Sequence, residues 1–231
     1  MTFKESSVLV TGATSGIGRA AALKFAAEGA RVALVGRNPD ALDATRKAMA
    51  ADGDRALAIQ ADVTREDDVR RAVDETVRAF GGLDALVCAA GVIGTGSIET
   101  TTPELWDQMM AVNVRSVFRL VQLALPALTP RTGSIVIVSS VNGQRAFPNV
   151  LAYCCSKAAV DQFVMCASLE LAPKGIRINA VNPGVTRTNL HRRSGMSEAD
   201  YAAFVERSRT THPIGRIGEP EEVADMILFL A

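Results

Sequence analysis

Short apolar runs alternate with longer amphipathic stretches along the first part of the chain. The runs cover residues 7–10, 31–35 and 56–60, and the stretches that follow them cover 16–28, 39–51 and 66–80. Short apolar runs of this kind predict strands, and apolar residues at helical spacing predict helices. Their regular alternation predicts βαβ units and a parallel sheet.

The same rhythm continues in the second part of the chain. We expect strands at 85–88, 134–138 and 177–181, a long helix within 103–128 and another helix over 151–171. Strands without polar alternation are typical of a sheet that is covered by helices on both faces. The pattern therefore predicts an α/β fold, a Rossmann-like doubly wound parallel sheet in three α/β/α layers. No repeat or linker interrupts the rhythm, so we expect a single domain over residues 1–231.

One long segment lacks this rhythm. About thirty-five residues separate Pro183-Gly184 from Glu219-Pro220, and only a piece near 198–208 has a helical pattern. Loops of this length in compact domains are usually functional lids or disordered. We expect a substrate lid, inserted at about 186–218.

Composition and charge exclude several classes of protein. The 25 Lys and Arg residues balance the 25 Asp and Glu residues, so nothing indicates nucleic acid or an anionic membrane as partner. The start of the chain lacks the apolar stretch of a signal peptide, and no apolar run approaches about 20 residues, so we expect no membrane association. The four cysteines show neither metal-ligand nor disulfide-framework spacing. We expect no metal site and a reducing, cytoplasmic location.

A glycine-rich loop directly follows the first predicted strand and begins the first predicted helix. Glycines at such a turn allow the backbone to approach a pyrophosphate, which then lies at the positive N-terminus of the helix. A glycine pattern alone is weak, but the order of strand, turn and helix makes it specific. The residues expected to form this cradle are Gly12, Thr14, Ser15, Gly16, Ile17 and Gly18.

The end of the second predicted strand bears on the choice of dinucleotide. An acidic residue at this position commonly holds the ribose of NAD, whereas a nearby arginine suits the 2′-phosphate of NADP. Here Gly36 occupies the acidic position and Arg37 follows it. We therefore expect NADP(H) in preference to NAD(H), with an ordinary surface charge as the other interpretation of Arg37. Asp62 is placed to meet the adenine, or else caps the next helix.

A tyrosine and a lysine lie four residues apart on the predicted helix 151–171. Tyr153 and Lys157 therefore share one helical face, and Ser140 lies thirteen residues before Tyr153 at the end of a strand. A nearby positive charge favours the phenolate and lowers the pKa of a phenol. The spacing predicts a proton-transfer site, although a half-buried Tyr beside a solvated Lys would show the same pattern.

Together these residues resemble the short-chain dehydrogenase/reductase family, from about residue 7 to the C-terminus. The resemblance implies that Tyr153 is the acid/base, that Ser140 bonds the reacting oxygen, and that Lys157 tunes Tyr153 and holds the ribose. It also implies that Asn113 organises a proton-relay water. The remaining cofactor contacts that it implies are Asp62, Val63, Ala89, Gly91, Pro183, Thr186 and Thr188.

The family pattern implies an oxidoreductase that transfers hydride between NADP(H) and a ketone or secondary alcohol. One version is a 3-oxoacyl thioester reductase whose substrate is bound to a carrier protein, because basic residues precede two strands and lie in the lid. These residues are Arg131, Lys174, His191, Arg192 and Arg193. The alternative is an NADP(H)-binding regulatory protein with little turnover. The resemblance also implies a homo-oligomer, a tetramer or dimer.

The chain departs from the family pattern in three places. Cys88-Ala89 stands where the family often has two asparagines, so we expect adjusted cofactor binding. Cys154 and Cys155 adjoin the tyrosine and are expected to be packing residues, with a redox-sensitive site as the alternative. The sequence ends at Ala231, before the final strand of most members, which bears on the oligomeric state.

Overall fold

A six-stranded parallel sheet forms the centre of the computed structural model, which describes residues 3–49 and 55–231. The strands lie in the order β3-β2-β1-β4-β5-β6, and every neighbouring pair is parallel. Their bounds are β1 Ser7–Thr11, β2 Arg31–Gly36, β3 Ala56–Gln60, β4 Ala85–Cys88, β5 Ser134–Val138 and β6 Arg177–Val181. The order reverses between β1 and β4, where sheets of this type bind ligands at the carboxyl ends of their strands.

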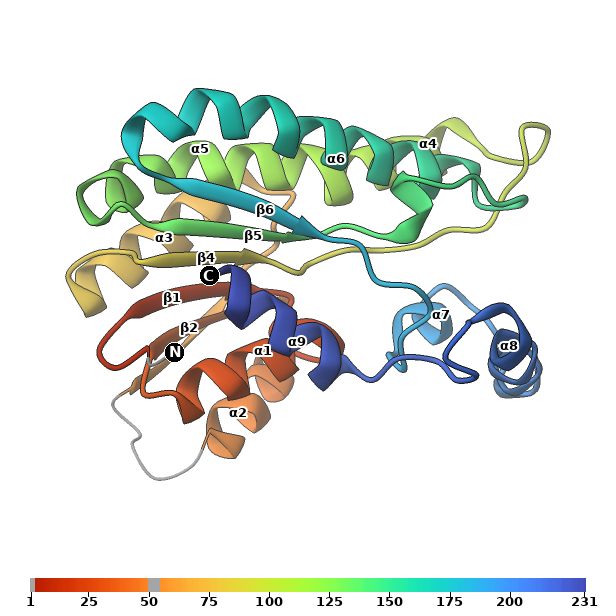
Figure 1. The fold of residues 1–231 in the computed structure, drawn as a ribbon, viewed down its shortest axis with the longest axis horizontal. Helices are drawn as coiled ribbons and strands as arrows, with labels where there is room; N and C mark the ends of the chain where they lie inside the picture. The colour runs from red at the N-terminus through yellow and green to blue at the C-terminus, as the bar shows by residue number, and fades with distance from the viewer. Residues whose placement is uncertain (1–2, 50–54) are drawn as a thin grey trace.

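Helices cover both faces of the sheet (Figure 1). One face carries α3 (Glu66–Phe80), α4 (Pro103–Met110), α5 (Ser116–Leu128) and α6 (Leu151–Leu171); the other carries α1 (Gly16–Ala27), α2 (Pro39–Ala48) and α9 (Pro220–Leu230). Every strand except the edge strand β3 has buried residues on both sides, and two apolar clusters result. Leu9 packs in the cluster with α3, α5 and α6, whereas Val8 and Val10 pack in the cluster with α1 and α9. The predicted three-layer Rossmann-like fold is confirmed.

Most element boundaries agree with the predictions from the hydrophobic pattern. β3 to β6, α3 and α6 have the predicted bounds, and β1 and β2 each extend one residue further, to Thr11 and Gly36. Helix α1 ends at Ala27, one residue earlier than predicted, with Glu28 as its C-cap. The helix predicted over 39–51 ends at Ala48, and residues 50–51 lie outside the described residues.

The helix predicted within 103–128 is interrupted. A π-helical turn, Ala111–Arg115, separates α4 from α5, and Asn113 lies inside it with 1% of its surface exposed. Single π turns widen a helix locally and are frequent at functional sites. The whole helical stretch Pro103–Arg131 is long and apolar enough to cross a membrane by length and composition alone. In this fold one face of α5, which includes Leu120 and Ala124, packs in the core against the sheet.

The segment predicted as a lid extends beyond the carboxyl ends of the strands (Figure 1). It contains α7 (Leu190–Arg193) and α8 (Glu198–Thr211), so the helical piece is three residues longer than predicted. Its two ends are joined at its base, where Arg187 N donates to Gly218 O at 2.9 Å and Gly218 N donates to Val185 O at 2.9 Å. The segment therefore leaves and re-enters the fold at one point, close to the predicted bounds of 186–218.

Candidate active site

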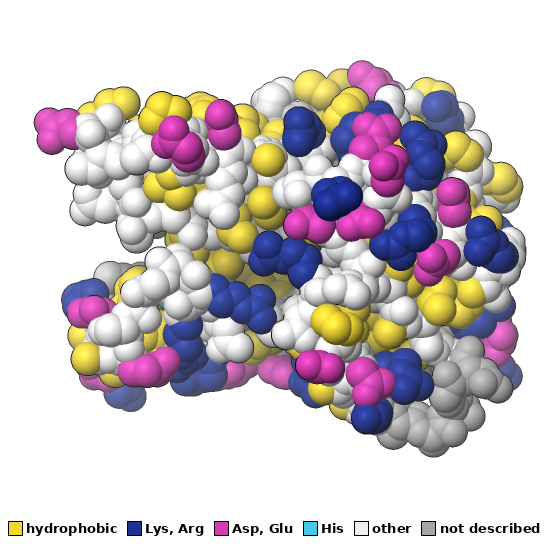
Figure 2. Space-filling view, turned by 180° about the vertical axis from the view of Figure 1, so that it is seen from behind, with side chains coloured by type: hydrophobic (Ala, Val, Ile, Leu, Met, Phe, Trp, Pro, Cys, Tyr) yellow, Lys and Arg dark blue, Asp and Glu magenta, His cyan; other side chains and the backbone are white. Residues whose placement is uncertain are grey.

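The predicted site residues gather at the carboxyl edge of the sheet. The loops after β1, β2, β3, β4, β5 and β6 carry Gly12, Arg37, Asp62, Ala89, Ser140 and Pro183 respectively. Figure 2 shows the molecule hollowed on this side, between the α7–α8 segment and the loops that follow the central strands, with Lys or Arg side chains at the inner end of the hollow. The predicted cofactor loop and the predicted catalytic residues therefore lie at the same edge of the sheet.

The glycine loop after β1 is packed so tightly that side chains are excluded. Gly12 has a φ of +69°, and a methyl group added to it would lie 2.7 Å from the Ala89 carbonyl oxygen. A methyl group on Gly18 would lie 2.5 Å from the Gly12 carbonyl oxygen. The loop therefore lies directly against the end of β4 and against the first turn of α1, as a backbone cradle for a pyrophosphate requires.

The N-terminus of α1 is open to an anion. Ser15 is its N-cap but makes no side-chain capping hydrogen bond, and the first turn carries no acidic residue. The first N–H groups of a helix have no partner within the helix, and the helix dipole makes this end positive. Gly16 faces Thr188, whose methyl group would lie 3.0 Å from an added Cβ. The cradle therefore fits the phosphates of a dinucleotide, and Thr188 lies beside it. The cofactor contact implied for Thr188 stays a prediction.

The rest of the cradle is held by its neighbours. A Cβ on Gly36 would lie 2.5 Å from the methyl group of Thr14, so this side chain covers the end of β2. The Thr45 hydroxyl donates to the Ala13 carbonyl at 3.0 Å and is fully buried. Ile17 is partly buried against the cluster that α1 and α9 share. These contacts fix the loop before any ligand is bound.

Arg37 and Asp62 lie beside the cradle in different environments. Arg37 is exposed directly after β2. Asp62 accepts hydrogen bonds from Thr64 N at 2.9 Å and from Thr64 Oγ1 at 2.7 Å. Burial raises the pKa of Asp62, but these hydrogen bonds and the Arg37 charge outweigh it and leave that pKa below its usual range. Asp62 does not cap α3, whose N-cap is Arg65.

The segment after β4 is held by a hydroxyl group on β1. Thr11 Oγ1 accepts from Ala89 N at 3.2 Å and from Ala90 N at 3.3 Å, so a hydroxyl on β1 holds this backbone. A Cβ on Gly91 would lie 3.8 Å from Lys157 Nζ, which places Gly91 beside this lysine. Val63, the remaining residue predicted near the adenosine, packs partly buried against the core.

Tyr153 and Ser140 form a buried pair. Tyr153 lies in the first turn of α6 with 7% of its surface exposed, and Ser140 is equally buried at 7%. Burial raises the pKa of the Tyr153 phenol, and hydrogen bonding to Ser140 opposes this rise. The net direction is opposite to the lowering that the Tyr153–Lys157 spacing predicted. The reason is that desolvation of the phenol outweighs the hydrogen bond with Ser140.

Lys157 is buried beside this pair. Its Nζ lies 5.8 Å from the centre of the Tyr153 ring and donates to the Val138 carbonyl at 2.9 Å. Burial lowers the pKa of Lys157 to about 8, and the Asp161 carboxylate opposes this lowering. The predicted proximity of the phenol and the ammonium is therefore present, with a lysine that changes charge near neutral pH.

Replacement of Lys157 should alter how stability depends on pH. The pKa of this group is about 8 in the folded protein and 10.5 in the unfolded chain, so between these values the unfolded chain binds more protons and wild-type stability rises with pH. Lys157→Met lacks this rise. We expect the difference in the free energy of unfolding, wild type minus variant, to increase by about 3 kcal/mol between pH 8 and pH 10.5, at about 1.4 kcal/mol per pH unit. Urea unfolding of both proteins over this range measures the gain, and parallel curves would contradict the burial of the charge.

The Asn113 side chain joins two elements of the site through hydrogen bonds. Its Oδ1 accepts from Val92 N at 3.0 Å, and its Nδ2 donates to Val92 O and to Ser156 Oγ, both at 3.0 Å. The side chain thus ties the segment after β4 to α6, next to Tyr153. The family resemblance implies that Asn113 organises a relay water, and this role remains a prediction. Because the side-chain amide is already hydrogen-bonded, the water would have to bind the backbone of the π turn.

The segment after β6 lies against the same site. The Pro183 carbonyl accepts from Val141 N at 3.1 Å, next to Ser140. Thr186 is buried and its hydroxyl donates to the Gly184 carbonyl at 3.2 Å. His212 Nε2 accepts from Val185 N at 3.1 Å, which links the end of α8 to this segment. His212 is half-buried in this position.

Three polar residues near Ser140 were missed by sequence reasoning. Asn182 Nδ2 donates to the Ser140 carbonyl at 3.0 Å and to Asp161 Oδ2 at 2.9 Å, and Asn142 exchanges hydrogen bonds with the Ser140 side chain. Asp161 lies one helical turn after Lys157, and this spacing was a signal that could have been read. The contacts of Asn142 and Asn182 join separate elements and leave no pattern in the sequence.

Two features lie outside this site. Within the described residues no group of three or more His, Cys, Asp or Glu residues could hold a metal ion, and all four cysteines are free.

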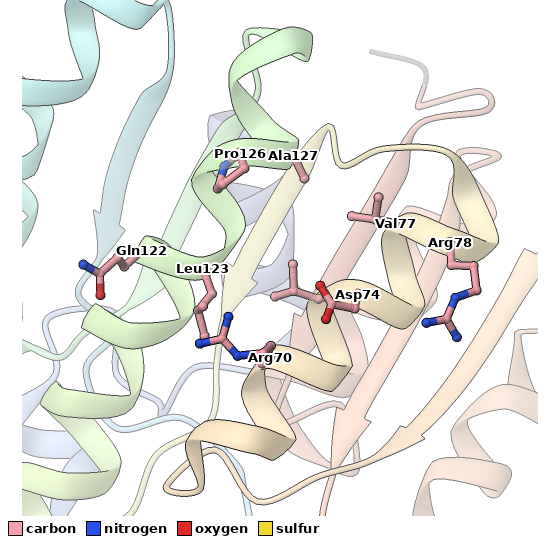
Figure 3. Close-up of a pocket in the computed structure, with 9 residues that line it drawn as sticks. Arg70, Asp74, Val77, Arg78, Gln122, Leu123, Pro126 and Ala127 are labelled. Atoms are coloured by element: carbon pink, nitrogen blue, oxygen red, sulfur yellow. The ribbon is translucent and has the colours of Figure 1, made fainter.

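A groove of about 510 Å³ lies between α3 and α5 (Figure 3), with Val73, Val77 and Leu123 among its lining residues. None of the predicted site residues lines this groove, so it is separate from the candidate active site.

Comparisons with known proteins agree with this geometry. The family model described as enoyl-(acyl carrier protein) reductase matches residues 12–231. Glucose 1-dehydrogenase from Gluconobacter oxydans is 40% identical over 233 residues, covering 99% of this chain and 86% of the relative. A short-chain dehydrogenase/reductase of unknown function from Caenorhabditis elegans, solved with cofactor, superimposes with a TM-score of 0.95 at 33% identity over 99% of this chain and 89% of its own. The 3-ketoacyl-(acyl-carrier-protein) reductase from Brucella melitensis, complexed with NADH, gives 0.89 at 30% identity over 99% and 91%.

Proposed function

The chain belongs to the short-chain dehydrogenase/reductase family and is an oxidoreductase of alcohol or ketone groups, and we propose that it transfers hydride between NADP(H) and a ketone or secondary alcohol. One observation carries the proposal: Ser140, Tyr153 and Lys157 are all buried, and Lys157 lies beside Gly91, in the segment that packs against the glycine cradle. Buried titratable groups in such a cluster are expensive to maintain and are typical of functional sites.

The chain's own residues account for the proton transfer. A bound nicotinamide supplies or accepts the hydride. In ketone reduction negative charge develops on the substrate oxygen, and Tyr153 donates a proton to it while the Ser140 hydroxyl shares the charge. In alcohol oxidation the Tyr153 phenolate takes the proton, and an ammonium at Lys157 favours that phenolate. The Asn113 side chain keeps α6 and the segment after β4 in register around these groups.

A substrate panel tests the proposed function. The protein is incubated with NADPH and a set of ketones that includes an acetoacetyl thioester, and loss of NADPH absorbance is followed. Turnover of any ketone supports a reductase. Binding of NADPH without turnover across the panel would favour the alternative, a regulatory protein that only senses the dinucleotide.

The preference for NADP(H) is the finer part of the proposal, and Arg37 supports it. This guanidinium is exposed after β2, where a 2′-phosphate would lie in this fold, and it can bind phosphate with two parallel hydrogen bonds. The similar Brucella reductase was solved with NADH, so the preference depends on Arg37 rather than on the family.

Loss of Arg37 should therefore weaken NADPH binding selectively. We expect Arg37→Ala to raise the Kd for NADPH about 10- to 100-fold, the equivalent of one charge-assisted bidentate contact, and to leave the Kd for NADH nearly unchanged. Arg78→Ala, an exposed arginine on α3 beside the remote groove, is the matched control. Equal effects of Arg37→Ala on both dinucleotides would contradict the proposed preference.

The basic residues of the sequence raise a narrower substrate class, a 3-oxoacyl thioester on a carrier protein, and the structure bears on it through the contacts of these residues. Lys174 is exposed before β6, whereas Arg131 already donates to the Gly81 carbonyl at 3.2 Å. In the lid, Arg192 pairs with Glu198 and its guanidinium lies 3.9 Å from the centre of the Tyr201 ring. Fewer free basic groups therefore remain for an acidic partner than the sequence indicated, and a small carbonyl substrate is favoured.

We also propose that the protein is a homo-oligomer with segment 186–218 as its substrate lid. Large apolar side chains are exposed on the outer faces of α5, α6 and α9, which is unusual for a monomer. They are Phe118, Met165, Leu169, Met226 and Phe229.

The lid proposal is supported by the joined base of the segment and its place over the carboxyl edge of the sheet. The cytoplasmic location remains a prediction.

A further inference from the structure

The Ser140 hydroxyl both accepts a hydrogen bond from Asn142 and donates one to it. Ser140 begins a short 3-10 turn, Val141–Gly143, and its Oγ accepts from Asn142 N at 3.2 Å. The same Oγ donates to Asn142 Oδ1 at 3.1 Å. A hydroxyl has one hydrogen, so at any moment Ser140 donates to only one of Asn142, Tyr153 and a substrate oxygen.

Asn142 is itself held from the helix that carries the tyrosine. Its Nδ2 donates to the Sγ of Cys154 at 3.4 Å, and Cys154 directly follows Tyr153 on α6. The turn lies close against α6, because a Cβ added to Gly143 would meet the Asp161 carboxylate and would lie 2.9 Å from the Lys157 carbonyl oxygen. A chain of contacts thus runs from the tyrosine-bearing helix through Asn142 to Ser140.

We propose that Asn142, anchored by Cys154, is a positioning residue that fixes the Ser140 hydroxyl for the reaction at Tyr153. The proposal rests on the proposed oxidoreductase function. The main-chain N–H of Asn142 holds the oxygen in place, while its side-chain oxygen keeps the hydrogen in a defined direction until charge develops on the substrate. Ordering a donor before charge develops is the way that enzymes lower the cost of stabilising that charge.

Asn142→Ala should lower kcat and leave binding unchanged. The Ser140 contact gains strength only as charge develops, so we expect kcat to fall about fivefold to tenfold, the equivalent of one hydrogen bond, with the KM for ketone and the Kd for NADPH unaltered. Gln144→Ala, an exposed polar residue at the end of the same turn, is the matched control and should retain wild-type kcat.

A double-mutant cycle separates positioning from a general structural role. Ser140→Ala should cost about 10²-fold in kcat, as does loss of one donor to a developing oxyanion. If Asn142 acts through Ser140, adding Asn142→Ala to Ser140→Ala changes kcat no further. A full fivefold to tenfold loss in that background would overturn the proposal.

Cys154 provides a second route that does not depend on the folding of Asn142→Ala. We expect Cys154→Ala to lower kcat about twofold to threefold in the wild type, as loss of one weak hydrogen bond would, and to have no effect in Ser140→Ala. The exposed neighbour Cys155 is the control, and Cys155→Ala should have no effect on kcat in either background. An unchanged kcat in Cys154→Ala would overturn the anchoring role.

The outcomes for the two proposals are distinct. Wild-type turnover that is lost in Tyr153→Phe, together with independent effects at Asn142 and Ser140, would overturn the positioning role and leave the proposed function intact. A wild type without turnover on any ketone of the panel would overturn both.

Discussion

Tyr153→Phe is expected to lower the rate of ketone reduction by about 10²- to 10⁴-fold, the range that a positioned general acid contributes. The substitution removes only the phenol oxygen, and Tyr153 is 7% exposed in a packed cluster with Met109 and Ala152. The ring therefore keeps its packing, and the variant should fold and bind NADPH like the wild type. Steady-state rates and a fluorescence titration of NADPH measure the two effects.

Tyr201 provides a matched control for this substitution. It is the other tyrosine of the chain and is also buried, and its ring lies beneath the Arg192 guanidinium. Tyr201→Phe removes the same oxygen and keeps the same ring, so we expect most of the activity to remain. Loss of NADPH binding in Tyr153→Phe, or equal losses of activity in both variants, would contradict the assignment of the proton transfer to Tyr153.

Gly12→Ala is expected to have the second large effect, on cofactor binding and on stability. The backbone at Gly12 has a φ of +69°, and the added methyl group would lie 2.7 Å from the Ala89 carbonyl oxygen. A residue other than glycine in such a conformation costs about 1–3 kcal/mol, and the overlap with backbone adds to this cost. We expect the loop to be displaced, the Kd for NADPH to rise at least about 10²-fold and the thermal midpoint to fall by several degrees.

Gly81→Ala separates the two causes of this effect. Gly81 has a similar φ of +77°, but no atom lies within 4 Å of an added Cβ. This variant therefore carries the conformational cost without the overlap, and it lies at the end of α3, away from the cradle. We expect a lower thermal midpoint with an unchanged Kd for NADPH. Unchanged NADPH binding in Gly12→Ala would contradict the cradle.

The fold could be predicted well because its strands are short, apolar and covered on both faces. Buried strands such as β5 leave a continuous apolar run, and the helix that follows each has a regular apolar face. The π turn at Ala111–Arg115 could not be predicted, because one extra residue in a helical turn does not alter the apolar periodicity enough to be seen. It is stabilised by hydrogen bonds of Asn113 with Val92 and Ser156, which are distant in sequence.

The site could be predicted where residues lie close in sequence or match a family motif. The Tyr153–Lys157 pair is of this kind, and the structure places both groups together. Their protonation could not be predicted from spacing, because it depends on how deeply the fold buries each group. The contact of Asn142 with Cys154 likewise depends on the approach of a turn to α6, and it became visible only in the structure.

The most direct test of the central claim is the fate of the hydride. A ketone that the wild type accepts is reduced with NADPH labelled with deuterium at the transferred position of the nicotinamide, and the alcohol is examined by mass spectrometry. We predict deuterium on the carbinol carbon in the wild-type reaction and almost none with Tyr153→Phe under the same conditions. Equal labelling by the two proteins, or an alcohol without deuterium from the wild type, would contradict hydride transfer assisted by Tyr153.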